Sequence, residues 1–175
     1  MWNEQIIMML LEGIKDTLYM TLTSTLIGYV IGLPMGILLT VTDKDGIHPN
    51  TAVYKVLDVI ANLIRSVPFL ILLIVLIPFT RFLIGRSYGP TATIVPLVIA
   101  AAPYIARMVE SSLKEVDAGV IEAARSMGAS NFTIVTKVML VEARTSLIVG
   151  ATISLGTILG YSAMAGTVGG GGLGD

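Results

Sequence analysis

The 175-residue sequence contains no cysteine and a single histidine, and only 13% of its residues are charged. Without cysteine the chain can form neither disulfides nor thiolate metal sites, and it has no cysteine nucleophile. A soluble domain carries a charged fraction of about a quarter. The scarcity of charge, with 54% hydrophobic residues and a mean hydropathy of +0.85, therefore predicts an integral membrane protein. The net charge of −1 and the lack of a basic stripe argue against a nucleic-acid partner.

Long runs without a formal charge are separated by charged connections. A helix needs about 20 mainly apolar residues to cross a bilayer, and we assign four such spans within one domain over residues 1–175. The predicted fold is all-α, with spans at about residues 17–41, 54–79, 88–107 and 145–161. The second span contains Asp58 and Arg65, for which we expect pairing with each other or, for Arg65, extension to the membrane surface. A kink is predicted at Pro68.

The first span contains three glycines in a regular series. Gly28, Gly32 and Gly36 are spaced four apart, which places them on one helical face. Small residues on such a face allow a second helix to come close, so we assign these three glycines to helix packing. Pro34, between them, is expected to bend the helix.

The sequence offers no motif for catalysis or metal binding. Residues 43–46 place a glycine too early for a calcium loop, and the glycine-rich tail, residues 166–175, lacks the Gly-Lys-Ser/Thr of a P-loop. No paired carboxylates and no nucleophile with an identifiable base lie in mid-span. We expect no catalytic residue, no metal site and no ATP hydrolysis on this chain.

Residues 115–143 form the longest charged run outside the spans. We predict two short helices around a glycine corner: Asp117 caps the first, Gly128 ends it with a positive φ, and Ser130 caps the second. The apolar residues of the second helix, Ile134, Val135, Val138 and Met139, recur at helical spacing.

The first of these two helices has small residues between charged ones. Ala123 and Ala124 would allow a partner backbone to come close, while Glu122 and Arg125 would fix the register of the contact. The alternative is an amphipathic helix pair that rests on the lipid surface with its charges in water.

A family resemblance favours the first interpretation. Glu122-Ala123-Ala124, three residues, Gly128, nine residues and Val138-Met139-Leu140 together resemble the EAA loop of ABC-importer permeases. The resemblance implies a type I importer permease in which Glu122, Ala123, Ala124 and Gly128 dock onto a cytoplasmic ATPase subunit. The sequence departs from the family pattern at Val138, where isoleucine is usual, and at Val141, where proline is expected.

Other segments resemble the methionine-uptake type of this family. They are Thr21–Gly28 with Gly32-Leu-Pro34-Met-Gly36, Arg65-Ser-Val-Pro68-Phe69 and the tail from Tyr161. The resemblance implies D- or L-methionine as the solute, and it leads us to expect one further C-terminal span that is truncated here. No physical property of these residues selects a thioether.

The resemblance also implies the partners: a second copy of the chain, two ABC ATPase subunits that hold ATP and Mg, and an external substrate-binding protein or lipoprotein. The membrane would be the bacterial inner membrane. If the connections alternate sides, residues 43–65 and 107–144 lie together and carry most of the basic residues, against Lys15, Arg81 and Arg86 on the other side. By the positive-inside rule the first side is cytoplasmic.

Two other functions stay open. One is the same permease architecture for another amino acid or small solute. The other is a proton-coupled secondary transporter, with Asp58, Arg65 or Glu110 as the relay. This second function would need ionisable groups at mid-membrane, whereas nearly all of them lie near the ends of the predicted spans.

Overall fold

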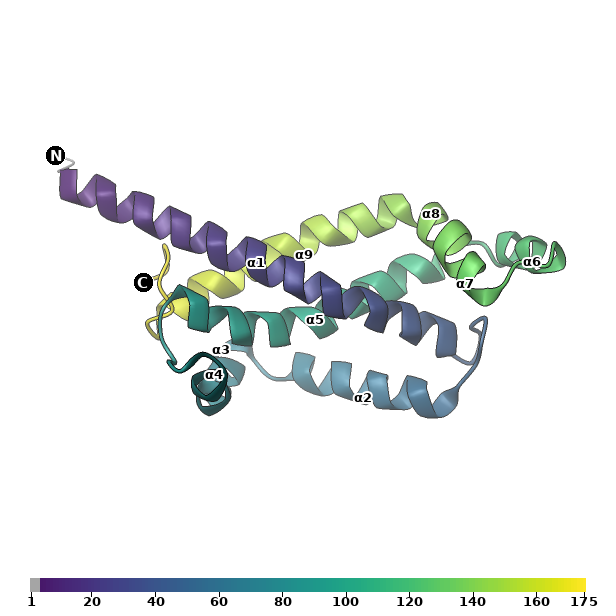
Figure 1. The fold of residues 1–175 in the computed structure, drawn as a ribbon, viewed down its shortest axis with the longest axis horizontal. Helices are drawn as coiled ribbons and strands as arrows, with labels where there is room; N and C mark the ends of the chain where they lie inside the picture. Colours follow the sequence, from purple (N-terminus) through teal and green to yellow (C-terminus); the bar gives the residue numbers. More distant parts are fainter. Residues whose placement is uncertain (1–3) are drawn as a thin grey trace.

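The computed structural model describes residues 4–175, and within that range the chain is helical with short connections and no strand (Figure 1). The all-α fold predicted from the sequence is confirmed. In chain order the elements are α1 (Glu4–Thr42), α2 (Thr51–Ser66), α3 (Phe69–Val75), α4 (Ile77–Ile84), α5 (Pro90–Lys114), α6 (Ala118–Ser126), α7 (Asn131–Thr133), the π-helical η1 (Ile134–Met139), α8 (Leu140–Glu142) and α9 (Arg144–Gly166).

Helix α5 is the centre of the bundle. It contacts α1, α2 and α9, and its contact with α1 is the most extensive of the described part of the chain. The most apolar part of α5 is 72% buried, against 33% for α1 and 22% for α9. Many large hydrophobic side chains of α1 and α9 are exposed. Such apolar outer surfaces are those of helices that face lipid or other transmembrane helices.

The three glycines of α1 lie against α5. A Cβ atom at Gly36 would stand 2.6 Å from the carbonyl oxygen of Ala106, and one at Gly32 would stand 2.7 Å from that of Ala102. At Gly28 the nearest atom would be 3.0 Å away, in the side chain of Ile105. The two helices therefore approach so closely that any larger residue at Gly32 or Gly36 would have to push them apart. Pro34 lies inside α1 without ending it.

Helix α1 is longer than the sequence indicates. It runs for 39 residues from Glu4, whereas the uncharged run predicts a span over residues 17–41. The charged residues Glu12, Lys15 and Asp16 mark the limit of the apolar run but leave the helix intact. All three have ordinary helix propensities.

The second span also differs from its prediction. Helix α2 begins at Thr51, where Asn50 accepts a hydrogen bond of 3.1 Å from the backbone N–H of Val53, and it ends before Pro68. Pro68 holds Val67 in an extended conformation (φ −86°, ψ 125°), so the chain leaves the helix and turns by 102° into α3. The expected kink is thus a break. The described residues contain three helices long and apolar enough to cross a membrane, or four if the α2–α3 pair counts as one span.

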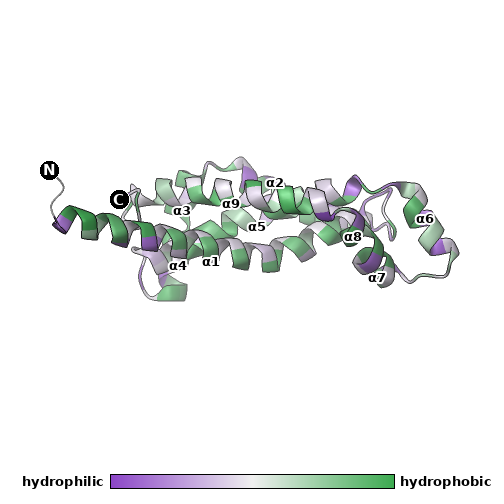
Figure 2. Cartoon of the chain, turned by 90° about the horizontal axis from the view of Figure 1, so that it is seen from above, coloured by the Kyte–Doolittle hydropathy of each residue, from purple (hydrophilic) through white to green (hydrophobic). Residues whose placement is uncertain are grey.

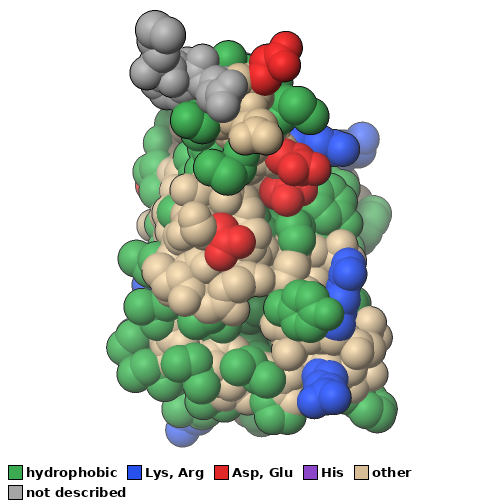
Figure 3. All heavy atoms as spheres, turned by 90° about the vertical axis from the view of Figure 1, so that its left-hand side faces the viewer, with side chains coloured by type: hydrophobic (Ala, Val, Ile, Leu, Met, Phe, Trp, Pro, Cys, Tyr) green, Lys and Arg blue, Asp and Glu red, His purple; other side chains and the backbone are tan. Residues whose placement is uncertain are grey.

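Hydrophobic residues run along most of α1, and hydrophilic residues appear along α2 and in α6 and α7 (Figure 2). At one end of the bundle lie α6, α7 and the connection between α1 and α2. At the other end the tail folds back over the bundle: Gly89 donates to the carbonyl of Gly169, and Leu173 donates to the hydroxyl of Thr17, both at 2.9 Å. Figure 3 shows this second end, where acidic and basic side chains stand among hydrophobic ones.

Candidate coupling segment and the charged cluster beside it

The corner between α6 and α7 is built by three local signals. The Asp117 side chain accepts a hydrogen bond of 2.7 Å from the N–H of Gly119, and the Ser130 hydroxyl accepts one of 3.2 Å from the N–H of Thr133. Gly128 has a φ of 81°, which favours glycine because other residues carry a Cβ atom that clashes there. The predicted caps and the predicted positive φ are confirmed.

The corner projects beyond the ends of the long helices (Figure 1). Glu122, Ala123 and Arg125 are exposed, whereas Ala124 is buried against the rest of the segment. The tip also exposes Met127 and Phe132, at 82% and 77% of their surface. Sequence reasoning missed these two residues, although their position beside the glycine corner was a usable signal. Small, charged and large apolar groups together form a surface suited to a protein partner.

Beyond the corner the chain reaches α9 through η1, α8 and a turn at Ala143. Ile134 and Met139 are buried and five residues apart, a spacing that fits the π-helical turn of η1. Ala143 joins α8 to α9 in a near-helical conformation (φ −77°, ψ 0°). Val141 occupies the place where the family pattern has proline, and a valine allows the chain to stay helical here.

A cavity lies between α6 and the bundle. Its volume is about 650 Å³, and it is bounded by the end of α5, by α6 and by the connection between α1 and α2. Arg125 spans this space and donates a hydrogen bond of 2.9 Å to the carbonyl of Ile47. The charged side chains that line the cavity are Asp43, Asp45, Lys114, Glu122 and Arg125.

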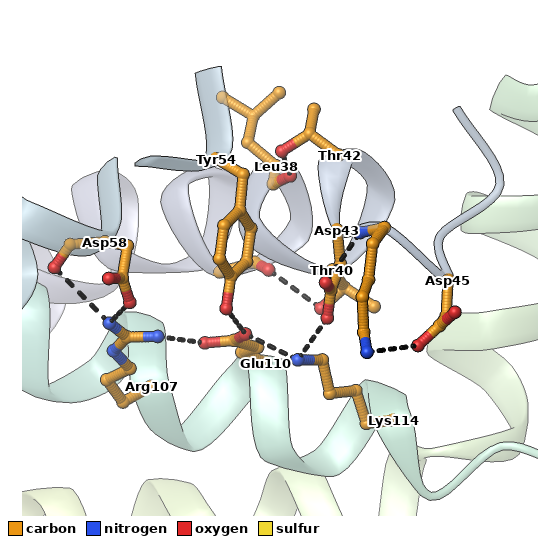
Figure 4. A network of polar contacts seen from close by, with 12 residues as sticks. Leu38, Thr40, Thr42, Asp43, Asp45, Tyr54, Asp58, Arg107, Glu110 and Lys114 are labelled. Atoms are coloured by element: carbon orange, nitrogen blue, oxygen red, sulfur yellow. Dashed lines mark hydrogen bonds and ion pairs between the residues drawn. The ribbon is translucent and has the colours of Figure 1, made fainter. Parts of the chain in front are cut away.

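Six residues form what we call the charged cluster, on the adjoining parts of α2 and α5 and just beyond the end of α1 (Figure 4). Its members are Asp43, Tyr54, Asp58, Arg107, Glu110 and Lys114.

Glu110 is the centre of the charged cluster, and its side chain is only 7% exposed. One of its oxygens accepts from the Arg107 guanidinium at 2.7 Å and the other accepts from the Lys114 ammonium at 2.8 Å. The Tyr54 hydroxyl donates to the same carboxylate at 3.5 Å. A buried carboxylate is stabilised only when such partners replace its water, so these contacts account for its position.

Asp43, just beyond the end of α1, completes the cluster on one side. Its carboxylate lies 2.6 Å from the Lys114 ammonium. This hydrogen bond, opposed only by partial burial, holds the pKa of Asp43 below its ordinary value of 3.8. Asp43 therefore stays ionised near neutral pH and ties the end of α1 to the end of α5.

Asp58 completes the cluster on the other side, and its partner is not Arg65. The Asp58 carboxylate pairs with Arg107 of the facing helix α5, while Arg65 is exposed. Arg65 follows Asp58 by about two helical turns, or roughly 10 Å along the axis, whereas Arg107 lies directly opposite (Figure 4). The pairing of Asp58 with Arg65 that the sequence suggested is thus absent from this structure.

The charged cluster is a network of ion pairs and hydrogen bonds. Among the described residues no group of three His, Cys, Asp or Glu side chains could hold a metal ion. The carboxylates of the cluster are paired with Arg107 and Lys114, and its one hydroxyl, that of Tyr54, donates to Glu110. What it can do is hold three helices in register at the end of the bundle that carries α6.

Several known proteins are similar to this chain. The D-methionine transport system permease protein MetI of Escherichia coli (strain K12) is 51% identical over 164 residues, which are 94% of this chain and 76% of that protein. The probable D-methionine transport system permease protein MetI of Vibrio cholerae serotype O1 is 47% identical over 167 residues, covering 95% and 74% of the two chains.

Solved structures give the same result. The MetNI methionine ABC transporter in inward-facing conformations is 51% identical with a TM-score of 0.97, covering 99% of this chain and 80% of that one. An amino acid ABC transporter with histidines, at 23% identity and a TM-score of 0.78, covers 97% of this chain and 76% of that one, and it shares the fold. Residues 7–175 match the family model for the "Binding-protein-dependent transport system inner membrane component", and the chain therefore belongs to this family of importer permeases.

Proposed function

We propose that the chain is the permease subunit of an ATP-driven importer for methionine, in D or L form, and that it works as a pair of copies with two ABC ATPase subunits. The observation that carries the proposal is the 51% identity to MetI over 94% of the chain. The TM-score of 0.97 to the permease of the MetNI transporter supports the same assignment. ATP and Mg belong to the ATPase, and the chain itself carries out transport without catalysis.

The docking element for the ATPase is the corner of α6 and α7. Its candidate contact residues are Glu122, Ala123, Ala124, Arg125 and Gly128. This role is supported by the projection of the corner beyond the bundle and by the exposed side chains at its tip. An exposed apolar tip in water is costly unless a partner covers it. The amphipathic-surface alternative would instead lay this tip on lipid.

The mechanism is alternating access driven by the ATPase. ATP binding draws the two ATPase subunits together, and the corner transmits that movement to the helices of the bundle. A ligand moves such an equilibrium only by binding its two states with different affinity. The corner must therefore contact the ATPase differently in the two states.

The orientation follows from the charges. The end that carries α6 faces the cytoplasm of a bacterium, because the connections there hold most of the basic residues. The opposite end, with the tail folded over α1 and α5, faces an external substrate-binding protein or lipoprotein, and lipid of the inner membrane surrounds the apolar helices of the bundle.

Transport by the purified complex in proteoliposomes tests the proposal. We expect uptake of labelled L-methionine that requires ATP on the ATPase side and is reduced by unlabelled D- and L-methionine. Reduction by another amino acid instead would assign a different solute to the same permease. Uptake that persists without ATP and follows a proton gradient would replace the importer with the secondary carrier.

A further inference from the structure

Helix α2 has little apolar contact to hold it in place. Ala61 is the only buried residue of this fully described helix. Five of its large apolar side chains are exposed, namely Val53, Val56, Val59, Ile60 and Leu63, whereas Leu57 and Ile64 are half-buried. Apolar packing of α2 is therefore limited to the narrow face that carries Leu57, Ala61 and Ile64, and polar contacts add to its attachment.

Arg107 of α5 makes most of those polar contacts. Its Nη2 atom donates to the carboxylate of Asp58, to the backbone carbonyl of Asp58 at 3.4 Å and to the side-chain oxygen of Asn62 at 3.0 Å. Its Nη1 atom donates to Glu110 on its own helix at 2.7 Å. Asn62 donates in turn to Asp58 at 3.2 Å. One guanidinium of α5 thus binds acceptors on two successive turns of α2 and a further acceptor on its own helix.

The chemistry of the side chain fits this role. A guanidinium presents donors in a planar fork and cannot be deprotonated, so it can bind two acceptors on one helix and a third on another. A lysine ammonium is a point charge without that fixed geometry. A shift of α2 along α5 would break these hydrogen bonds and the ion pair together, so the contacts hold the two helices in one register.

The contacts of Arg107 are also linked to segments beyond α2 and α5. Through Glu110 the guanidinium is linked to Lys114 and Asp43, beside the cavity next to α6. At its other end α2 leads into the break at Pro68 and then α3, where Phe69 stacks on Tyr161 of α9 with ring centroids 4.6 Å apart. The position of α2 on α5 is therefore linked to the charged cluster, shown in Figure 4, and to the stacked pair of Phe69 and Tyr161.

We propose that Arg107 is a positioning residue for transport. It joins α2 to α5 through Asp58 and Asn62, contacts that we call the clasp, so that α2 and α3 move with α5 when the ATPase drives the bundle. The proposal rests on the proposed function. If the clasp is lost, ATP hydrolysis continues but moves less solute, because α2 no longer follows α5.

The test uses the full permease–ATPase complex in proteoliposomes, with uptake and ATP hydrolysis measured on the same sample. We expect Arg107→Gln to lower the solute taken up per ATP by about tenfold or more, because it removes the guanidinium that joins α2 to α5 and leaves the partly buried Asp58 without its cation. Arg107→Lys retains the charge and is expected to restore part of that ratio. The matched control is Arg65→Gln on α2, a similarly charged but exposed side chain, which is expected to leave the ratio unchanged.

A double substitution separates the clasp from a general loss of stability. In Asp58→Asn the clasp is already weakened, so adding Arg107→Gln is expected to lower the ratio much less than it does alone. The proposal is overturned if Arg107→Gln has the same ratio of solute to ATP as Arg65→Gln. It is also overturned if the fold-losses of Asp58→Asn and Arg107→Gln multiply in the double variant, as they would for independent sites. If Arg107→Gln does not assemble, Arg107→Lys decides, and a wild-type ratio in that variant overturns the proposal. Wild-type complex without ATP-driven uptake would instead refute the proposed function.

Discussion

Arg125 of α6 donates a hydrogen bond of 2.9 Å to the backbone carbonyl of Ile47, which lies in the connection between α1 and α2. The two residues are 78 positions apart in the sequence, so this contact joins the candidate coupling corner to a different part of the chain. The same connection begins at Asp43, which pairs with Lys114 of α5. The corner is thereby tied to the bundle at a point other than its own two ends.

The first prediction concerns this contact. Arg125→Met removes the donor, and we expect faster amide hydrogen exchange in residues 43–50, because the connection loses its link to α6. Hydrogen exchange with mass spectrometry on the purified complex measures the effect. Lys137→Met is the control, since Lys137 is an exposed cation of the same segment. Equal exchange in both variants would mean that the hydrogen bond does not restrain the connection.

The second prediction concerns Gly128. With a φ of 81°, this position costs a non-glycine residue about 1–2 kcal/mol. We expect Gly128→Ala to distort the corner and to lower the amount of ATPase that co-purifies with the permease, while the permease still inserts into the membrane. Gly156→Ala in α9, where a Cβ atom meets open space, is expected to co-purify normally.

The third prediction concerns the contact of α1 with α5. A Cβ atom at Gly36 would stand 2.6 Å from both the carbonyl oxygen of Ala106 and the Cβ of Val109. We expect Gly36→Val to force the helices apart and to destabilise the protein by about 1–3 kcal/mol, the usual cost of overpacking. Thermal unfolding in detergent measures this loss. Gly160→Val provides the control, because no atom lies within 4 Å of the Cβ position there.

The charge pair of Asp43 and Lys114 gives a prediction about pH. The pKa of Asp43 is lower in the folded chain than its ordinary value of 3.8, because Lys114 hydrogen-bonds to it, so folding favours the ionised form. The stability that Asp43 contributes is therefore present above pH 3.8 and is lost as the pH falls through the folded pKa. We expect Asp43→Asn to unfold at a lower temperature than wild type at neutral pH, with the difference shrinking below about pH 4.

Asp45→Asn is the control for this measurement. Asp45 is exposed and its nearest cation is the neighbouring Lys44, at 3.7 Å. An exposed pair of this kind contributes little to stability, so this variant is expected to follow wild type throughout. An Asp43→Asn curve that is parallel to wild type down to acid pH would show that the pair with Lys114 does not stabilise the fold.

The sequence predicted local features of the fold better than contacts between residues far apart in the chain. The caps at Asp117 and Ser130 and the positive φ at Gly128 follow from rules that involve a few neighbouring residues, and the structure has all three. The pairing of Asp58 with Arg107 joins residues 49 positions apart, and no periodicity states which side of α2 faces α5. The sequence placed Asp58 near Arg65 because both lie on one helix.

The ends of the helices were also only partly predictable from local sequence. Pro68 predicted a kink in the second span, whereas the structure has a break with a bend of 102°, and α3 beyond it packs on α5 and α9. The start of α1 at Glu4 was missed because the apolar run sets the part that spans lipid, whereas the helix continues through charged residues. The π-helical turn at residues 134–139 was also missed, since its spacing of five reads as helical in a short window.

The last prediction concerns the side of the membrane on which the corner lies. The chain has no cysteine, so a single introduced cysteine is the only thiol that a reagent can label. Met127 and Phe132 are highly exposed at the tip of the corner, and Leu173 is exposed in the tail at the opposite end. In whole cells an impermeant maleimide is expected to label Leu173→Cys, whereas Met127→Cys should react only after the membrane is opened. Phe132→Cys should react as Met127→Cys does, and the ATPase should protect both.

Labelling of Met127→Cys from outside would place the corner on the external face, where no cytoplasmic ATPase can reach it, and docking would be excluded. Reaction from neither side would place the tip in lipid, because a thiol in hydrocarbon does not ionise to the reactive thiolate, and would favour the amphipathic-surface alternative.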